Sequence, residues 1–331
     1  MSRSLHPDNP DSHVSGVGQG ALAVSLAPAL RDHCGGRLGD IAWFRSDWQR
    51  GGASTGYADW TCDDGSKREV VVKLPIGPIE HRFLVGLAKS DAPTPRVIAE
   101  GHEIAGYDLA WAVMERLPGS PMARTLDKEH FREIADAAAA FHKHALDLCP
   151  VDKPAVEPDW EALLAKSRDA TKTVRLDHAG HWNDLIHKVQ KTLSKFLPIW
   201  LARDTKCWRH GDLHPGNAMH RPDGSPWGPP GCVLLDLAEV RAGHWVEDAI
   251  YLEHLHWSRP EALDGVKCVS LLAKARRAHG LDTSDDYPTL ANIRRVLYAA
   301  AAPANIRQEG SPAHLDASLH TLERLLPVVA K

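Results

Sequence analysis

The segment His210-Gly211-Asp212-Leu213-His214-Pro215-Gly216-Asn217 decides how this sequence of 331 residues is read. Nineteen residues after Asn217, an apolar stretch with the sequence CVLLD ends at Asp236. A loop that presents an Asp and, five residues later, an Asn can aim both side chains at one point. The Asp212 carboxylate can accept a proton from a hydroxyl group. The oxygens of Asn217 and Asp236 suit Mg²⁺, which prefers a few protein oxygens together with phosphate oxygens.

Helical patterns flank this segment on both sides. Apolar residues recur at intervals of three and four, which predicts helices over 128–148, 159–172, 179–202, 260–279, 287–301 and 313–329. The stretch 207–239 between them is rich in Pro and Gly, and we expect one strand in it, over 232–235. The chain after residue 117 is therefore predicted to be mainly helical, with one irregular segment.

The first third of the chain has a different pattern. Its first 20 residues are polar and predict a disordered tail, and a short helix is predicted over 21–32. Alternating and β-branched residues predict strands over 41–48, 57–62, 69–74, 96–99 and 109–115. The Asp64-Gly65 step predicts a hairpin, and one helix is predicted over 79–89. The organisation is thus α+β, with a β-rich part over 21–117 and a helical part over 118–331.

Composition excludes several classes of protein. The 39 Lys and Arg against 43 Asp and Glu leave a formal net charge of −4, which argues against a nucleic-acid-binding protein and leaves no polybasic stretch for a membrane surface. The six cysteines form no CxxC pair, which excludes a zinc ribbon and a dense disulfide framework. The N-terminus lacks the apolar run of a signal peptide, and no stretch of about 18 apolar residues could span a membrane. We therefore expect a cytoplasmic protein with reduced cysteines and no membrane partner.

The spacing from Asp212 to Asn217 equals that of the HRDxxxxN block of protein kinases, with Gly211 in place of the Arg. With HGDLHPGN, the downstream LLDLAEV and this order of elements, the sequence resembles the aminoglycoside phosphotransferase-like small-molecule kinases. The resemblance extends in outline over residues 38–257. It implies a protein-kinase-like α+β fold with a small β-rich, nucleotide-binding N-lobe and a larger helical C-lobe that holds the catalytic loop and the substrate site.

The resemblance also implies roles for particular residues. Asp212 would be the catalytic base, and Asn217 and Asp236 would be the metal ligands. His210 would hold the catalytic loop by hydrogen bonding. Asp248 resembles the family's later aspartate that braces the same loop backbone, and its alternative reading is an acid that caps a helix N-terminus.

The nucleotide site is expected in the β-rich part. Lys73, in VVVKLP at the end of the third strand, would contact the α- and β-phosphates, and Glu80 on the next helix would hold Lys73 in place. Small residues between the first two strands would cover the phosphates through backbone N–H groups, and we expect Gly51, Gly52, Ser54 and Thr55 there. The backbone of Glu115 to Leu117, in VMERLPG, is expected to bind the adenine edge.

Two hydrolase readings compete with a kinase and are disfavoured. GASTG matches the nucleophile-elbow pattern GxSxG, but a strand and turn follow it instead of the required helix. Twenty histidines suggest a zinc site, yet HExxH is absent and Gly211 and Pro215 prevent a continuous helix between His210 and His214. Histidines such as His142 are read as core or surface residues.

We expect a kinase that uses ATP, or alternatively GTP, with Mg²⁺ to phosphorylate a hydroxyl of a small molecule. The near-neutral charge does not support a polycationic acceptor, so an antibiotic, a sugar, a choline-like amine and an amino alcohol all stay open, as does the oligomeric state. Five tryptophans of the helical part could stack on the acceptor or belong to the core, namely Trp182, Trp200, Trp208, Trp245 and Trp257. The alternative from another class is a nucleotide-binding pseudo-kinase with a regulatory role, which the presence of Asp212, Asn217 and Asp236 disfavours.

Overall fold

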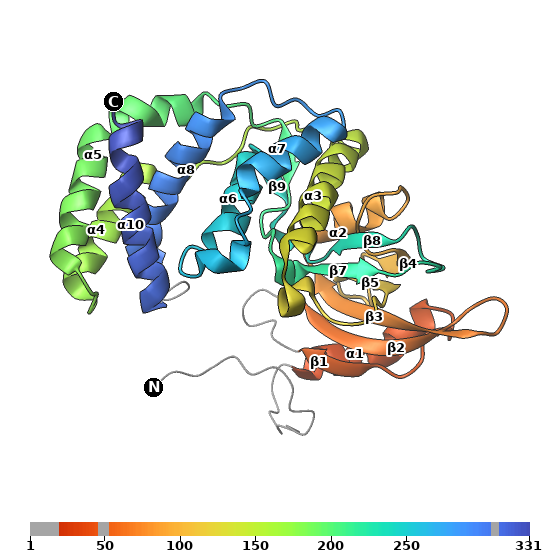
Figure 1. Cartoon of the computed structure of the whole chain (residues 1–331). Coiled ribbons are helices and arrows are strands. Elements are labelled where there is room, and N and C mark those ends of the chain that lie inside the picture. Colours follow the sequence, from red (N-terminus) through yellow and green to blue (C-terminus); the bar gives the residue numbers. More distant parts are fainter. Residues whose placement is uncertain (1–19, 46–52, 306–310) are drawn as a thin grey trace. The chain divides into compact units, whose positions relative to one another are not determined.

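A computed structural model describes residues 20–45, 53–305 and 311–331 (Figure 1). The chain forms two compact units. The sheet unit comprises Met1–Gly77 and Val97–Arg116, and the helical unit comprises Pro78–Arg96 and Leu117–Lys331. The predicted disordered tail lies almost wholly outside the described residues. The predicted division into lobes at residue 117 stays a prediction, and residues 78–96 group with the helical unit.

The sheet unit consists of one helix and a five-stranded antiparallel sheet in the order β1-β2-β3-β5-β4. Its elements are α1 (Gly20–His33), β1 (Ala42–Arg45), β2 (Ser54–Thr61), β3 (Lys67–Ile76), β4 (Val97–Gly101) and β5 (Ala110–Glu115). Alternate residues of β3 are buried, from Val70 to Ile76, because successive side chains of a strand point to opposite faces. Leu26 and Leu30 of α1 pack against this buried face, and α1 lies along the sheet in Figure 1.

The helical unit contains most of the described helices and two short strand pairs around the predicted catalytic loop. Its longer helices are α2 (Pro78–Leu87), α3 (Lys128–Leu148), α4 (Trp160–Thr173), α5 (Ala179–Leu201), α6 (Val246–His254), α7 (Cys268–Ala278), α8 (Tyr287–Ala301) and α10 (Pro312–Val329). Its 3₁₀ turns are η2 (Met122–Thr125), η3 (Pro215–Asn217), η4 (Leu237–Glu239), η5 (Pro260–Leu263) and η6 (Ala302–Asn305). Its strands are β6 (Cys207–Arg209), β7 (Ala218–Arg221), β8 (Gly231–Leu234) and β9 (Arg241–Gly243), paired as β6 with β9 and β7 with β8.

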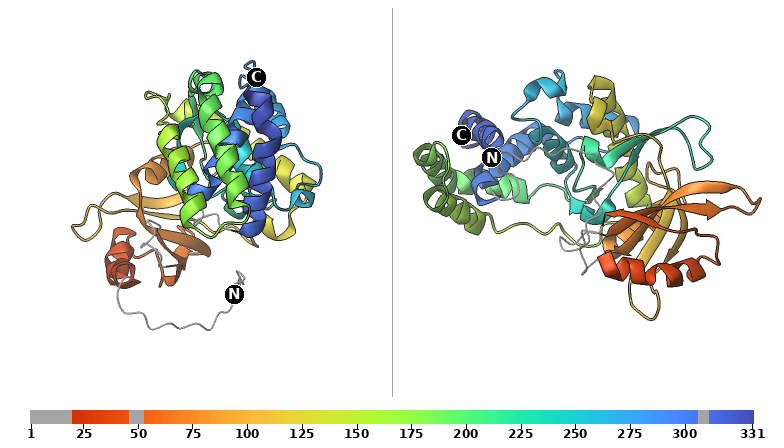
Figure 2. Two further views of the ribbon diagram at one scale, coloured as in Figure 1. Left: turned by 90° about the vertical axis from the view of Figure 1, so that its left-hand side faces the viewer. Right: turned by 90° about the horizontal axis from the view of Figure 1, so that it is seen from below.

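The main core of the helical unit lies between α4, α5, α8 and α10, which run side by side in Figures 1 and 2. Apolar residues at helical spacing supply it, including Ile186, Phe196 and Trp200 of α5, none of which is exposed. Of the tryptophans considered for acceptor stacking, four are buried and belong to the core, namely Trp182, Trp200, Trp208 and Trp245. Trp257 is half-buried.

The predicted α+β fold is confirmed, and most predicted elements are observed within one to three residues. The predictions for 128–148 and 287–301 match α3 and α8. The continuous helix predicted over 260–279 is wrong, because the chain breaks between η5 and α7, where Asp264 and Gly265 adopt positive φ angles of 46° and 72°. Three short strands, β6, β7 and β9, were not predicted, since runs of three or four residues carry almost no periodicity.

All six cysteines lie in the described ranges and are free thiols, as predicted. None of the helices in those ranges is both long and apolar enough to cross a membrane.

Two isoleucines on α5 test the location of this core. Ile186→Ala should lower the free energy of unfolding by about 2–5 kcal/mol, because it opens a cavity among fully buried side chains. The matched change Ile199→Ala affects a side chain that is 48% exposed and should cost less than about 0.5 kcal/mol. Urea denaturation of both variants measures the difference, and equal losses would contradict the assigned core.

Candidate active site

The segment His210–Asn217 connects β6 to β7, and its neighbours bring Asn217 close to Asp236. In the β7–β8 hairpin, Ala218 pairs with Leu234. The Leu235 N–H donates a hydrogen bond to the Asn217 carbonyl oxygen at 2.8 Å. Asn217 therefore lies beside Leu235, which follows the last residue of β8 and precedes Asp236. The two proposed metal ligands meet because they occupy the same end of one hairpin.

The buried carboxylate of Asp248 holds the start of this segment. Its Oδ2 accepts a hydrogen bond from the His210 N–H at 2.8 Å, and its Oδ1 accepts one from the Gly211 N–H at 2.9 Å. Asp248 lies in the first turn of α6 and is fully buried. It therefore contacts the backbone of the segment, in the geometry that the resemblance implies for it.

Asp248 is also part of a buried network of hydrogen-bonded side chains. The His142 ring on α3 lies with Nε2 2.9 Å from Asp248 Oδ2, and its Nδ1 is 3.1 Å from Arg276 Nη1 on α7. Arginine can only donate, so His142 Nδ1 accepts and its Nε2–H donates to Asp248. His142 is predicted to be a core or surface residue, and the structure places it in the core, where it links Arg276 to Asp248.

Burial sets the charge states in this network. Burial lowers the pKa of His142 and of His210, so both rings are neutral near pH 7. Burial alone would raise the pKa of Asp248, but the hydrogen bond from His142 and nearby cations outweigh it and hold that pKa at about 2. Asp248 is therefore an ionised carboxylate inside the protein.

His210 links the two halves of the site. Its Nε2–H donates to the Leu235 carbonyl at 3.0 Å, and its Nδ1 accepts from the Asp212 N–H at 3.3 Å. The ring thus holds the residue before Asp236 and the backbone of Asp212 at once. The predicted role of His210 in supporting the catalytic loop stays a prediction.

Gly211 is required by the close approach of another segment. Its φ angle is +84°, and a Cβ atom there would lie 2.1 Å from the Glu239 carbonyl oxygen. No side chain fits in that space, and most residues disfavour that backbone conformation. The position that carries Arg in the kinase block is therefore restricted to glycine here. Asp236 is also in the left-handed region, with φ of 61°, a conformation that costs a non-glycine residue on the order of 1 kcal/mol.

Three neighbours surround the Asp212 side chain. Asn217 Nδ2 donates to its Oδ2 at 2.8 Å and to its backbone carbonyl at 3.1 Å. The Tyr251 hydroxyl donates to its Oδ1 at 2.6 Å. His214 Nε2 lies 3.5 Å from Oδ2, and its Nδ1 accepts from the Gly216 N–H. Tyr251 and His214 were not predicted, because nothing in their sequence spacing identifies a partner of Asp212.

These donors hold the pKa of Asp212 well below its usual range. The interaction with His214 is the largest cause; burial opposes it, and the bonds from Tyr251 and Asn217 add to it. Asp212 is therefore ionised at every physiological pH. A carboxylate with so low a pKa is a weak base, better suited to orienting a hydroxyl than to removing its proton early.

The oxygens near the hairpin end fit a hard divalent cation. The Asn217 amide nitrogen is bound to Asp212, which leaves the amide oxygen as its ligand atom, and Asp236 adds a carboxylate. Such oxygens are the ligands that Mg²⁺ prefers. The side chain of Glu239, the next acidic residue after Asp236, is 58% exposed, and its Oε2 lies 3.5 Å from Arg241 Nη1.

The predicted nucleotide-binding residues are spread over both units. Lys73 lies within β3, paired with Thr55 and Ala112, so the prediction that it ends the strand is wrong. Ser54 and Thr55 begin β2, so the prediction that they lie in the loop before that strand is wrong; Gly51 and Gly52 lie outside the described residues.

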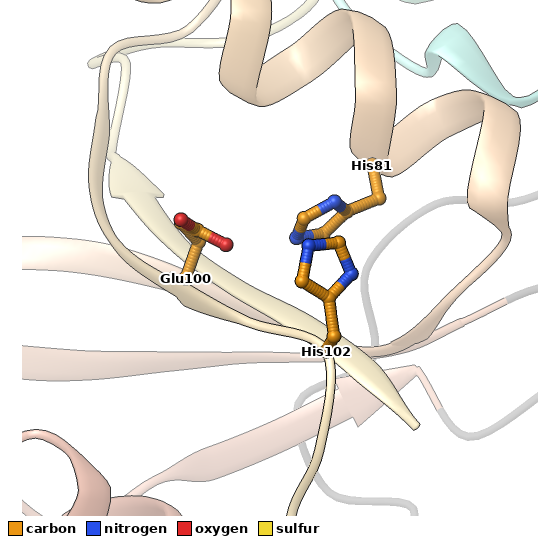
Figure 3. Close-up of side chains that lie close together, drawn as sticks. All are labelled: His81, Glu100 and His102. Atoms are coloured by element: carbon orange, nitrogen blue, oxygen red, sulfur yellow. The ribbon is translucent and has the colours of Figure 1, made fainter. Parts of the chain in front are cut away.

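The other predicted nucleotide-binding residues are Glu80, Glu115 and Leu117. Glu115 is buried at the end of β5, and Leu117 is buried in the helical unit. Glu80 is buried in the first turn of α2, and this helix packs against η4, beside Asp236. Figure 3 shows the next residue, His81, on α2, and it shows Glu100 and His102 at and just beyond the end of β4.

Comparisons with known proteins place this fold. The model of the phosphotransferase enzyme family matches residues 50–314. A glucosamine kinase structure aligns with a TM-score of 0.56 and 17% identity, covering 92% of this chain and 84% of the other. A spectinomycin phosphotransferase, in complex with ADP and spectinomycin, aligns with a TM-score of 0.54 and 13% identity, covering 91% and 93%. No curated protein matches the sequence. At these identities the two structures show the fold, which is kinase-like.

Gly211→Ala should destabilise the helical unit more than a matched glycine change. A left-handed alanine costs about 1–2 kcal/mol, and the contact with Glu239 should add about 1–3 kcal/mol. Gly224→Ala is the control, because Gly224 has φ of +72° with open space around its Cβ position. Equal changes in the urea unfolding midpoint would contradict the close approach of Glu239.

The neutral buried histidines make stability depend on pH. Below the unfolded pKa of about 6.5, the unfolded chain binds protons that folded His142 and His210 do not, so stability falls as pH decreases from about 7 to 5. Each such group contributes up to about 1.4 kcal/mol per pH unit. His142→Gln should flatten this slope, whereas His320→Gln, on an exposed side chain, should not. Unfolding free energies measured from pH 5 to 7.5 test this, and an unchanged slope in His142→Gln would refute it.

Proposed function

Because this chain belongs to the phosphotransferase enzyme family and is a small-molecule kinase, we propose that it transfers the γ-phosphoryl group of ATP to a hydroxyl of a small molecule. The observation that carries the proposal is the arrangement around Asp212, whose carboxylate is ionised, bonded to Asn217, and located on a segment braced by Asp248. GTP is the alternative donor. We place the reaction in the cytoplasm, without a nucleic-acid or membrane partner.

Asp212 would orient the acceptor hydroxyl and take its proton. Phosphoryl transfer proceeds through a loose transition state in which the attacking oxygen forms little bond before the leaving group departs. The hydroxyl proton becomes acidic only late in such a step, so a weakly basic carboxylate suffices. The depressed pKa of Asp212 agrees with this role, since the residue is always ready to accept a hydrogen bond from the acceptor.

Asn217 and Asp236 would hold Mg²⁺. When bound, this ion would offset the negative charge that develops during phosphoryl transfer. The protein's part is to keep both ligands at one end of the β7–β8 hairpin, and His210 does so through its bond to the Leu235 carbonyl.

The nucleotide would be bound as the family resemblance implies. We assign Lys73 to the α- and β-phosphates, Glu80 to the support of Lys73, and the backbone of Glu115 to Leu117 to the adenine edge. Backbone N–H groups at the start of β2 and in the segment before it would cover the phosphates, and we keep Gly51, Gly52, Ser54 and Thr55 in that role.

The acceptor class is tested with purified protein, ATP and Mg²⁺. A panel of aminoglycosides, macrolides, sugars and amino alcohols is screened for acceptor-dependent release of ADP, and the phosphorylated product is identified by mass spectrometry. Acceptor-dependent release supports a kinase and names its substrate class. Nucleotide binding without transfer to any of these compounds would favour the pseudo-kinase alternative.

Asp212→Ala should reduce acceptor-dependent transfer by about 10²–10⁴-fold, the usual contribution of a positioned acid or base. Nucleotide binding should stay largely intact, because the phosphates and the adenine are assigned to other residues. Asp223→Ala removes an exposed acid from the turn between β7 and β8 and serves as the control. Wild-type turnover in Asp212→Ala would refute the role of Asp212.

A further inference from the structure

Tyr251 makes a contact with Asp212 that the proposed reaction leaves unexplained. Its hydroxyl donates a hydrogen bond to Asp212 Oδ1 at 2.6 Å, from the middle of α6. That is the same kind of bond that an acceptor hydroxyl must make to the same carboxylate before phosphoryl transfer. A protein hydroxyl therefore already donates to the group that orients the acceptor.

The two oxygens of Asp212 are not equivalent. Oδ2 is bonded by Asn217 at 2.8 Å and approached by His214 at 3.5 Å. The described structure gives Oδ1 one such donor, Tyr251. An acceptor hydroxyl would donate to the same Oδ1 and would do so in place of the Tyr251 hydroxyl.

An acceptor takes this position only when the tyrosine hydroxyl moves away from Asp212. Tyr251 is half-buried, so it is not enclosed by the core on all sides. Its ring lies 4.9 Å, centroid to centroid, from the ring of the buried His254 on the same helix, and its carbonyl oxygen lies 2.6 Å from His254 Nδ1. Turning the side chain breaks the bond to Asp212 while α6 stays in place.

We propose, building on the proposed function, that the Tyr251 hydroxyl stands in for the acceptor at Asp212 until an acceptor binds, and so keeps water from attacking ATP. An acceptor competes with the tyrosine hydroxyl for Asp212 more effectively than water does. A phenol, with a pKa of about 10, is a better donor to a carboxylate than water, with a pKa of about 15.7. An acceptor brings further contacts that offset the loss of the tyrosine bond, whereas a water molecule has none.

The reaction that Tyr251 would suppress is ATP hydrolysis. In that side reaction the oxygen of a water molecule forms a bond to the γ-phosphorus, the bond from this phosphorus to the bridging oxygen of ADP breaks, and the water proton passes to Asp212. The products are ADP and inorganic phosphate. With Tyr251 in place, the position at Oδ1 from which water would be oriented is taken.

Tyr251→Phe tests the proposal without any acceptor. The full-length protein is incubated with Mg-ATP, and the release of inorganic phosphate is measured. Loss of a hydrogen bond to a charged group should raise the hydrolysis rate on the order of tenfold over wild type. The control is Tyr107→Phe, which removes the same hydroxyl from a residue that is 56% exposed in the sheet unit, and its rate should equal that of wild type.

Further measurements separate the proposal from a merely structural role of the tyrosine. The double variant Asp212→Asn/Tyr251→Phe should lose the extra hydrolysis, because water is then oriented by no carboxylate. A rate in Tyr251→Phe that equals or falls below the wild-type rate overturns the proposal, as does phosphate found on Tyr251 itself by mass spectrometry. If transfer to an acceptor persists in that case, the proposed function stands. If neither protein binds Mg-ATP by calorimetry, the proposed function fails as well.

Discussion

The hydrogen bonds to the buried carboxylate of Asp248 are the constraint on which the rest of the site depends. An ionised carboxylate with no exposure would cost several kcal/mol without partners. Here its partners are the N–H groups of His210 and Gly211 and the ring of His142. The charge is stable only when α3, α6 and the chain after β6 meet at this point. The fold of the helical unit and the shape of the catalytic segment therefore require each other.

From that point, two further contacts set the positions of the reacting groups. The ring of His210 connects the Asp212 backbone to Leu235, and the absence of a side chain at Gly211 lets the Glu239 carbonyl approach. The segment with Asp212 and Asn217 and the segment with Asp236 are thus held by neutral hydrogen bonds and by close packing.

The environment of Asp212 fixes the orientation of its carboxylate and makes it a weak base. Donors on both carboxylate oxygens keep it ionised and oriented, which weakens it as a base and suits a reaction whose proton is released late. The Tyr251 contact adds a condition, since an acceptor must compete with a hydroxyl of the protein itself. The binding energy of the acceptor would then both orient its hydroxyl and displace the Tyr251 hydroxyl from Asp212.

The sequence by itself determined the α+β class, most helix and strand positions, and the residues of the catalytic segment. Those features depend on local periodicity and on the spacing from Asp212 to Asn217. Each of these patterns lies within one short stretch of the chain. Only the tertiary structure decided that His142, Arg276 and Tyr251 belong to the site, that 260–279 is two helical segments, and that Lys73 lies inside its strand. His142 is 106 residues from Asp248, and Tyr251 is 39 from Asp212. Partners so far apart in sequence leave no periodic signal, because their contact results from the packing of separate helices and not from the conformation of either one.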